Sequence, residues 1–309
     1  MHARRLPPAV EMKLALGPLT YYWPRERVLD FYSRAASWPV DIVYLGETVC
    51  ARRHELRVAD WIELASKLAD AGKEAVLSTY ELIENDADLR LMRQVVENGR
   101  FRVEANDMGA VRLLAGRGPF VAGPFLNVYN GSTLDLLAEC GAARWVAPVE
   151  LSGAGLAQAI AEKTSPAETE LFAFGRIPLA VSARCFTARY HNLDKDHCDY
   201  RCIRDPEGLA LRTQDGEPFL VLNGVQTQSA RVQNLLPYLG HALAMGVDVL
   251  RLSPQAERME EVVRSFDLAA QGALDPAAAA ARLAAALPAA PCDGYWHGRA
   301  GMLHEGAAP

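Results

Sequence analysis

Short apolar runs rich in β-branched residues alternate with longer amphipathic segments along most of this chain. Continuous apolar runs of this length indicate buried strands, which suit a parallel sheet covered by helices. Eight such runs occur, at residues 13–17, 41–46, 74–80, 101–105, 120–125, 144–150, 170–177 and 247–253. Most segments between them approximate the helical period. Eight β–α alternations over about 250 residues predict an α/β fold, a (β/α)8 TIM-like barrel, with a doubly wound open sheet as the structural alternative.

Two stretches interrupt the alternation. Residues 181–216 hold three cysteines, many charges and little periodicity, which predicts a cysteine-bearing insertion after about the seventh strand. Residues 218–223 form a further strand-like run, so strand numbering near the end stays open. The alanine-rich stretch at 269–291 predicts a helix followed by irregular chain. We expect an irregular N-terminal extension at 1–12, a single domain at 13–300 and a C-terminal tail at 301–309.

Composition limits the partners of the chain. The 309 residues are 50% hydrophobic and 23% charged, which is ordinary for a globular protein. A net charge of −6 argues against nucleic acid as the main partner, because such binding needs clustered Lys and Arg. The sequence contains no run of about 18 apolar residues, so we expect no transmembrane segment. The N-terminal MHARRLPPAVEM lacks the apolar stretch of a signal peptide, so we expect a cytoplasmic protein that starts at Met1 or Met12.

The cysteine layout carries the first chemical prediction. Cys185, Cys198 and Cys202 lie in a polar segment with little apolar surface, which favours metal or cluster binding over simple burial. Cys50 directly follows the second predicted strand. Because active sites of (β/α)8 barrels form at the carboxyl ends of strands, Cys50 and the 185–202 group are expected on one face. Cys292 competes as a fourth ligand, whereas Cys140 fits a buried helical position.

The residues alone leave two kinds of metal centre open. Structural zinc sites usually show two close cysteine pairs, and only one close pair occurs here. A [4Fe–4S] cube tolerates dispersed ligands, so the spacing mildly favours a cluster. His191 and His197 keep a zinc site with three cysteines and one histidine open.

Charged and aromatic residues at the predicted strand ends are further candidates. Glu47, Glu104, Asp107 and Glu150 suit acid–base work or a second metal, with ion pairs and loop caps as the alternative. Arg184 and Arg251 suit a carboxylate or phosphate substrate, or those same acids. Tyr21, Tyr22 and Trp23 suit an aromatic wall or packing at the barrel mouth. The phosphate-binding, dinucleotide-binding and serine-elbow motifs are absent.

Several long motifs resemble one known family. They include LGPLTYYWPRE, VYLGETVCARR, ENGRFRVEANDMGAVRLL, IPLAVSARCFTARYHNLDKDHC and CDGYW, and the match runs over residues 13–300. On these residues the chain resembles the U32 peptidase-like family, and within it the branch that serves oxygen-independent ubiquinone biosynthesis.

The resemblance implies a (β/α)8 barrel with a [4Fe–4S] cluster on Cys50, Cys185, Cys198 and Cys202. Cys292 also matches the family pattern, though not as a ligand. It implies an iron–sulfur subunit for oxygen-independent ring hydroxylation of a prenylated aromatic quinone precursor. The implied partners are a homologous UbiU-like subunit, in a heterodimer, and a lipid-carrier accessory protein. No catalytic residue is assigned. The alternatives are a zinc-stabilised scaffold for a catalytic partner and a U32-type peptidase, for which no nucleophile–base arrangement stands out.

Overall fold

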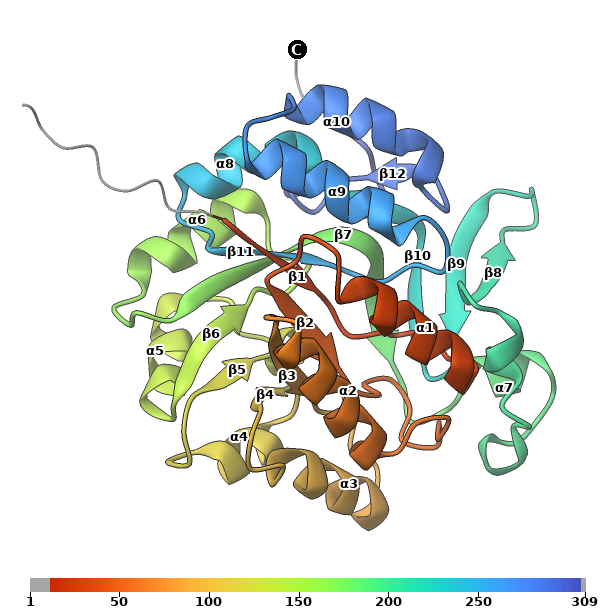
Figure 1. The fold of residues 1–309 in the computed structure, drawn as a ribbon. Coiled ribbons are helices and arrows are strands. Elements are labelled where there is room, and N and C mark those ends of the chain that lie inside the picture. The colour runs from red at the N-terminus through yellow and green to blue at the C-terminus, as the bar shows by residue number, and fades with distance from the viewer. Residues whose placement is uncertain (1–11, 307–309) are drawn as a thin grey trace, which may run out of the picture.

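In the computed structural model, which describes residues 12–306, eight parallel strands close into a barrel (Figure 1). The barrel strands are β1 (Lys13–Leu16), β2 (Ile42–Leu45), β3 (Glu74–Ser78), β4 (Arg102–Ala105), β5 (Phe120–Ala122), β6 (Ala142–Val146), β7 (Glu168–Val181) and β11 (Val249–Leu252). Closure occurs at β11, which pairs in parallel with both β1 and β7. The predicted (β/α)8 barrel is therefore confirmed, and the open sheet is excluded.

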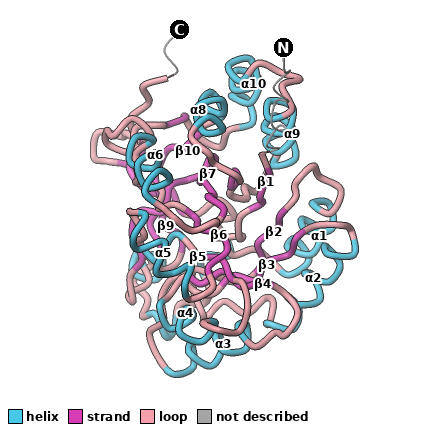
Figure 2. The backbone as a smooth tube through the Cα atoms, turned by 90° about the vertical axis from the view of Figure 1, so that its left-hand side faces the viewer, coloured by secondary structure: helices cyan, strands magenta, loops and turns pink. Residues whose placement is uncertain are grey.

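Helices separate successive strands and cover the outside of the barrel (Figure 2). They are α1 (Arg25–Ala35), α2 (Val58–Asp70), α3 (Asp86–Val96), α4 (Met108–Leu114), α5 (Gly131–Glu139), α6 (Gly153–Glu162), α8 (Leu239–Ala244) and α9 (Met259–Ala270). Asn85, Asp107, Asn130 and Ser152 cap four of them by accepting hydrogen bonds from N-terminal backbone N–H groups. Each cap satisfies backbone N–H groups at the start of a helix that follows a strand of the barrel.

Two groups of apolar side chains fill the fold. The inner group lies inside the barrel and consists of Ala15, Ile42, Tyr44, Val76, Val121, Val146 and Val249, all fully buried. The larger group lies between the strands and the helices, as the alternation of side chains along each strand requires. The barrel interior is thus a packed core rather than a pore, and space for a ligand exists only at an end.

The predicted insertion after the seventh strand is present and reshapes the barrel mouth. It contains α7 (Phe186–Tyr190), the short 3-10 helices η2 (Lys195–His197) and η3 (Arg201–Arg204), β8 (Leu209–Arg212), β9 (Pro218–Asn223) and β10 (Gln226–Asn234). The long β7 leaves the barrel and pairs antiparallel with β10, which pairs with β9, and β9 with β8. Residues 218–223 are thus a strand, as expected, but one outside the barrel. Their neighbour β10 was not predicted.

The C-terminal residues pack against β10, one of the strands outside the barrel. After α10 (Pro276–Leu283) and η5 (Ala284–Ala286), β12 (Pro291–Cys292) pairs in parallel with β10. The predicted helix is present, although irregular chain gives way to this short strand. Asp293 then holds the tail by accepting hydrogen bonds from the backbone N–H of Glu305 and Gly306. Residues 1–11, most of the expected extension, lie outside the described residues, as do 307–309.

The helices of residues 12–306 are short or polar in part. None of them combines the length and the apolar composition that crossing a membrane requires.

Candidate functional site

Four cysteines occupy two segments at the barrel mouth. Cys50 lies in the loop between β2 and α2, while Cys185 caps the start of α7, Cys198 ends η2 and Cys202 lies in η3. All four are free thiols of intermediate exposure. Gly46 starts the Cys50 loop with φ +131°, where an added Cβ would lie 2.8 Å from the Ser78 carbonyl oxygen. Only glycine fits that turn without strain.

An ion pair joins the two segments. Arg52 Nη1 lies 2.5 Å from Asp196 Oδ1, and Arg52 Nη2 donates to the Asp196 backbone oxygen at 3.0 Å. Each residue lies two positions from a cysteine, Cys50 in one case and Cys198 in the other. The His54 and Tyr200 rings meet in the same region, with centroids 4.7 Å apart. The fold thus brings together the segments that were expected on one face.

The pKa values of Cys185 and Cys202 respond to burial and to neighbouring charges. Burial raises the pKa of Cys185, and negative charge on Cys50 or Cys198 would raise that pKa further. Burial likewise raises the pKa of Cys202, which the positive charge of Arg53 opposes and charge on Cys185 reinforces. Coulombic influence of this kind requires the side chains to be neighbours. The four cysteines therefore form one electrostatic neighbourhood.

Arg53 is the fixed cation of this neighbourhood. Its residue is 4% exposed, and its Nη1 donates to the Thr20 backbone oxygen at 2.7 Å. Its Nη2 donates to Asn223 Oδ1, also at 2.7 Å, and Glu47 lies at 3.4 Å. An added Cβ at Gly224 would lie 2.9 Å from Arg53 Nη2, so the β9–β10 turn leaves room for the guanidinium. A buried cation held in this way can offset the charge of nearby thiolates.

The donor set around the cysteines suits some metal centres and not others. Among residues 12–306, no three His, Cys, Asp or Glu side chains are arranged to hold a single metal ion. A [4Fe–4S] cube instead takes one cysteine per iron, so its ligands need not converge on one ion. Four free, half-buried thiols in one electrostatic neighbourhood fit that requirement. Their assignment as ligands stays a prediction.

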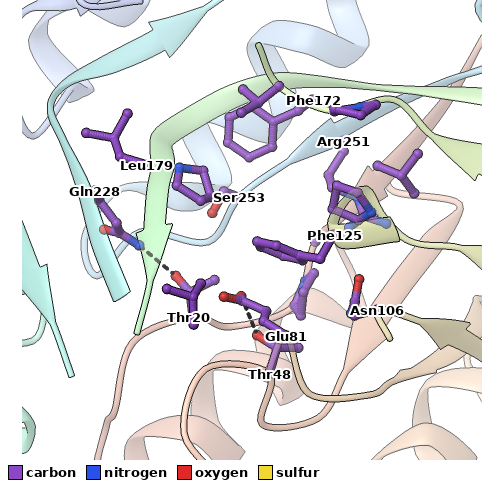
Figure 3. Close-up of a pocket in the computed structure, with 18 of the residues that line it drawn as sticks. Thr20, Thr48, Glu81, Asn106, Phe125, Phe172, Leu179, Gln228, Arg251 and Ser253 are labelled. Atoms are coloured by element: carbon purple, nitrogen blue, oxygen red, sulfur yellow. Dashed lines mark hydrogen bonds between the residues drawn. The ribbon is translucent and has the colours of Figure 1, made fainter. Parts of the chain in front are cut away.

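A cavity of about 380 Å³ opens at the carboxyl ends of the barrel strands (Figure 3). Its volume lies in the range typical of small-molecule sites. Most of the wall is apolar and includes Leu82, Pro124, Phe125, Phe172, Pro178 and Leu179. Polar and charged side chains also line it, those of Thr20, Thr48, Glu81, Glu104, Asn106, Asn127, Glu150, Arg176, Gln228, Arg251 and Ser253. A wall that is mostly apolar and carries several polar groups suits a small ring compound with polar substituents.

The charged residues nearest the barrel interior neutralise one another. Arg251 lies 2.7 Å from Glu104 and 2.6 Å from Glu170, and its guanidinium lies 4.0 Å from the centre of the Tyr44 ring. The Tyr44 hydroxyl donates to Glu170 at 2.5 Å. Of the two uses open for Glu104 and Arg251 from the sequence, the structure therefore favours mutual pairing.

Glu81 was not among the sequence candidates, although it directly follows the strand predicted at residues 74–80. Its carboxyl group projects toward the cavity near Thr20 and Thr48 (Figure 3). Gln226 Nε2 donates to both carboxyl oxygens, at 2.8 and 3.0 Å, and the Thr48 hydroxyl donates at 3.3 Å. Burial is the main cause that raises the pKa of Glu81 to about 8, with a contribution from negative Glu47. The raised pKa favours the protonated form of this carboxyl group.

Hydrogen bonds connect the cavity with the cysteine neighbourhood. Gln226 donates to Glu81, and its Oε1 accepts from Gln228 at 2.7 Å and from Asn223 at 3.5 Å. Asn223 in turn accepts from Arg53. The polar strand β10 and the preceding turn thus tie the two parts of the site into one network.

Residues 29–296 match the family model of peptidase family U32. The chain belongs to this family. The matched span includes Cys50, Cys185, Cys198, Cys202 and Glu81, so both parts of the site lie within the U32 region.

Solved structures that resemble this U32 chain have low sequence identity to it. The U32 peptidase Mk0906 is 11% identical with a TM-score of 0.44, over 82% of this chain and 97% of that one. A tryptophan synthase from M. tuberculosis is 13% identical with a TM-score of 0.41, over 88% and 93% of the two chains. Dihydropteroate synthase from Thermus thermophilus is 12% identical with a TM-score of 0.41, over 84% and 94%.

Several other expected residues of the U32 chain have structural roles. Asp107 caps α4, and Glu150, at the cavity mouth, accepts a hydrogen bond from the Tyr129 hydroxyl. Arg184 is exposed and does not line the cavity. Tyr21, Tyr22 and Trp23 are buried, and Trp23 donates to the Pro206 oxygen at 2.7 Å, as expected for packing at the barrel mouth.

The two remaining cysteines lie apart from the four. Cys140 ends α5 and packs against the core, and Cys292 is fully buried on β12. Burial raises the pKa of Cys292 to about 12, and the charges that act on it come from Asp293, Arg231 and Arg176. His191 and His197 are exposed at the ends of α7 and η2.

Proposed function

We propose that this U32 chain is a UbiV-like iron–sulfur subunit required for oxygen-independent ring hydroxylation in ubiquinone biosynthesis. It would act with a homologous UbiU-like subunit and a lipid-carrier accessory protein on a prenylated aromatic quinone precursor. Membership of the U32 family supports the proposal at the level of the family. The choice of this branch rests on the long motifs around the cysteines.

One observation carries the proposal. Four free thiols from two distant segments form one electrostatic neighbourhood, joined by the Arg52–Asp196 pair, at the same barrel mouth as a ligand-sized cavity. Thiolates are the usual ligands of iron–sulfur clusters. A cofactor site beside a cavity in a (β/α)8 barrel is the arrangement expected of an enzyme subunit.

Each part of the site has a distinct role under this proposal. Cys50, Cys185, Cys198 and Cys202 would hold a [4Fe–4S] cluster, which supplies one-electron transfer or braces the insertion. Arg53 offsets the negative charge of the thiolates from a buried and fixed position. The cavity takes the aromatic ring, while its apolar wall excludes water from it.

Anoxic co-expression with the UbiU-like subunit tests the assignment. We expect the two chains to co-purify, and the Cys198→Ala variant to lose iron and to abolish quinone production in cells grown without oxygen. Cys140→Ala is the matched control, because Cys140 lies outside the four, and it should retain both properties. Normal quinone production by an iron-free Cys198→Ala variant would contradict the proposed role of the cluster. Peptide cleavage by the purified chain would favour a peptidase instead.

A further inference from the structure

Glu81 differs from the other carboxylates around the barrel mouth. Glu47 pairs with Arg53, Glu104 pairs with Arg251, and Glu170 pairs with Arg251 as well. Within residues 12–306, Glu81 forms no ion pair, and its partners Gln226 and Thr48 are uncharged. A carboxyl group placed in this way is not needed to neutralise a neighbouring arginine.

The position of Glu81 makes its carboxyl group available to a ligand. It lies on the loop after β3, where the residue is half-buried and lines the cavity (Figure 3). Gln226 and Thr48 fix its orientation from two separate elements, β10 and the Cys50 loop. A polar group held by other side chains before a ligand arrives loses little freedom on binding.

The surroundings define what the group can recognise. Leu82, Phe125 and Leu179 give the cavity an apolar wall. The nearby charges of Glu47 and Arg53, and of Glu104 and Arg251, are already paired. Arg176, which also lines the cavity, donates to the backbone oxygens of Ser229 and Ala230, and Glu150 accepts from the Tyr129 hydroxyl. Because burial raises its pKa to about 8, Glu81 offers an O–H donor near neutral pH rather than a negative charge.

We propose that this cavity takes an uncharged ring compound and that Glu81 is its ligand-binding residue. The Glu81 carboxyl group donates a hydrogen bond to an oxygen among the substituents of the ring. This inference deepens the proposed function and rests on it for the biological ligand. The binding chemistry itself follows from the cavity and from a carboxyl group that forms no ion pair within the described residues. It adds a substrate-touching residue that was not among the sequence candidates.

Binding of acetophenone to the full-length, anoxically purified chain tests the inference. Acetophenone carries one acceptor oxygen and does not titrate, so any pH dependence of its binding comes from the protein. Ethylbenzene is the matched probe without the oxygen. We expect the ratio of acetophenone to ethylbenzene affinity to be about tenfold higher near pH 6 than above about pH 9, the factor that one hydrogen bond provides.

Variants separate Glu81 from the other groups of the cavity. Glu81→Gln keeps an N–H donor, so it should keep the preference and lose the pH dependence. Glu81→Leu should give the low ratio at every pH. Glu97→Gln, an exposed site at the end of α3, should behave like the wild type. Absence of acetophenone binding to the wild type, or an unchanged pH dependence in Glu81→Gln, would overturn the inference.

Iron content measured on the same samples keeps the two claims apart. A chain that holds iron but shows no Glu81-dependent preference contradicts this inference and leaves the proposed function standing. A chain that shows the preference but never holds iron contradicts the proposed function alone.

Discussion

Arg52 and Asp196 form an ion pair between loops that are 144 residues apart in the chain. Its two contacts, at 2.5 and 3.0 Å, lie between the segments that carry Cys50 and Cys198. Both side chains are partly exposed, 38% and 79%, so the pair contributes little to global stability. Its effect is to restrict how far the two cysteine-bearing segments can separate.

Removal of this pair should affect the cluster more than the fold. Arg52→Ala is expected to change the free energy of unfolding by less than about 1 kcal/mol, as for other exposed pairs. We expect the same variant to lose iron several-fold faster on exposure to a chelator. Arg264→Ala, which breaks the exposed Arg264–Glu260 pair on α9, is the control and should lose iron at the wild-type rate. Equal rates for all three proteins would show that the pair does not hold the segments together.

Loss of Arg53 should destabilise the chain strongly. Arg53→Met leaves Glu47 buried without its cation and removes the bonds to Thr20 and Asn223. Breaking a buried pair from one side typically costs about 3–5 kcal/mol, which urea unfolding of the apoprotein would measure. The double variant with Glu47→Gln should recover part of that loss. Arg25→Met, at the exposed Arg25–Asp60 pair, should cost about 1 kcal/mol or less.

The raised pKa of Glu81 predicts a dependence of stability on pH. Its pKa rises from 4.5 to about 8 on folding, so the folded chain keeps a proton that the unfolded chain loses. The stabilisation is complete below about pH 4.5, decreases as pH rises, and is lost above about pH 8, with a total of a few kcal/mol. Glu81→Gln should therefore gain in melting temperature relative to the wild type from pH 5 to pH 9. A constant difference across that range would contradict the raised pKa.

Asp293 should control the order of the C-terminal segment. Its buried carboxylate accepts from the Tyr238 hydroxyl at 2.8 Å and from the N–H groups of Glu305 and Gly306 at 2.7 and 3.1 Å. Asp293→Ala leaves these donors unpaired, at about 1–3 kcal/mol for each one that stays buried. We expect faster amide hydrogen exchange in residues 299–306 with little change in the barrel strands. Unchanged exchange there would mean that other contacts hold the tail.

The barrel was predictable because its strands have a simple composition. Runs such as IVYL in β2 and EAVLS in β3 are buried on both faces, and that pattern identifies strands of a parallel sheet. The strand β10, with the sequence QTQSARVQN, was not predictable in this way. Its buried glutamines satisfy each other, Glu81 and backbone groups, and polar partners of this kind leave no hydrophobic period in the sequence.

The candidate site was predictable in part for a similar reason. Placing Cys50 and Cys185 at strand ends was enough to expect their segments on one face, because parallel strands of a barrel end together. Glu81 could not be distinguished from other loop acids in the sequence. It lacks an ion pair within residues 12–306 because the fold brings the nearby arginines to Glu47, Glu104 and Glu170 instead. The pairing of charges is a property of the tertiary structure.

Iron and acid-labile sulfide per chain, measured on the wild-type protein purified without oxygen, test the central claim most directly. We expect about four iron and four sulfide per chain, as one [4Fe–4S] cube requires. We also expect iron and sulfide to be lost when Cys50, Cys185, Cys198 or Cys202 is replaced by alanine. Both should be retained in Cys140→Ala and Cys292→Ala. Fewer than about three iron per chain after reconstitution, with zinc in their place, would contradict it.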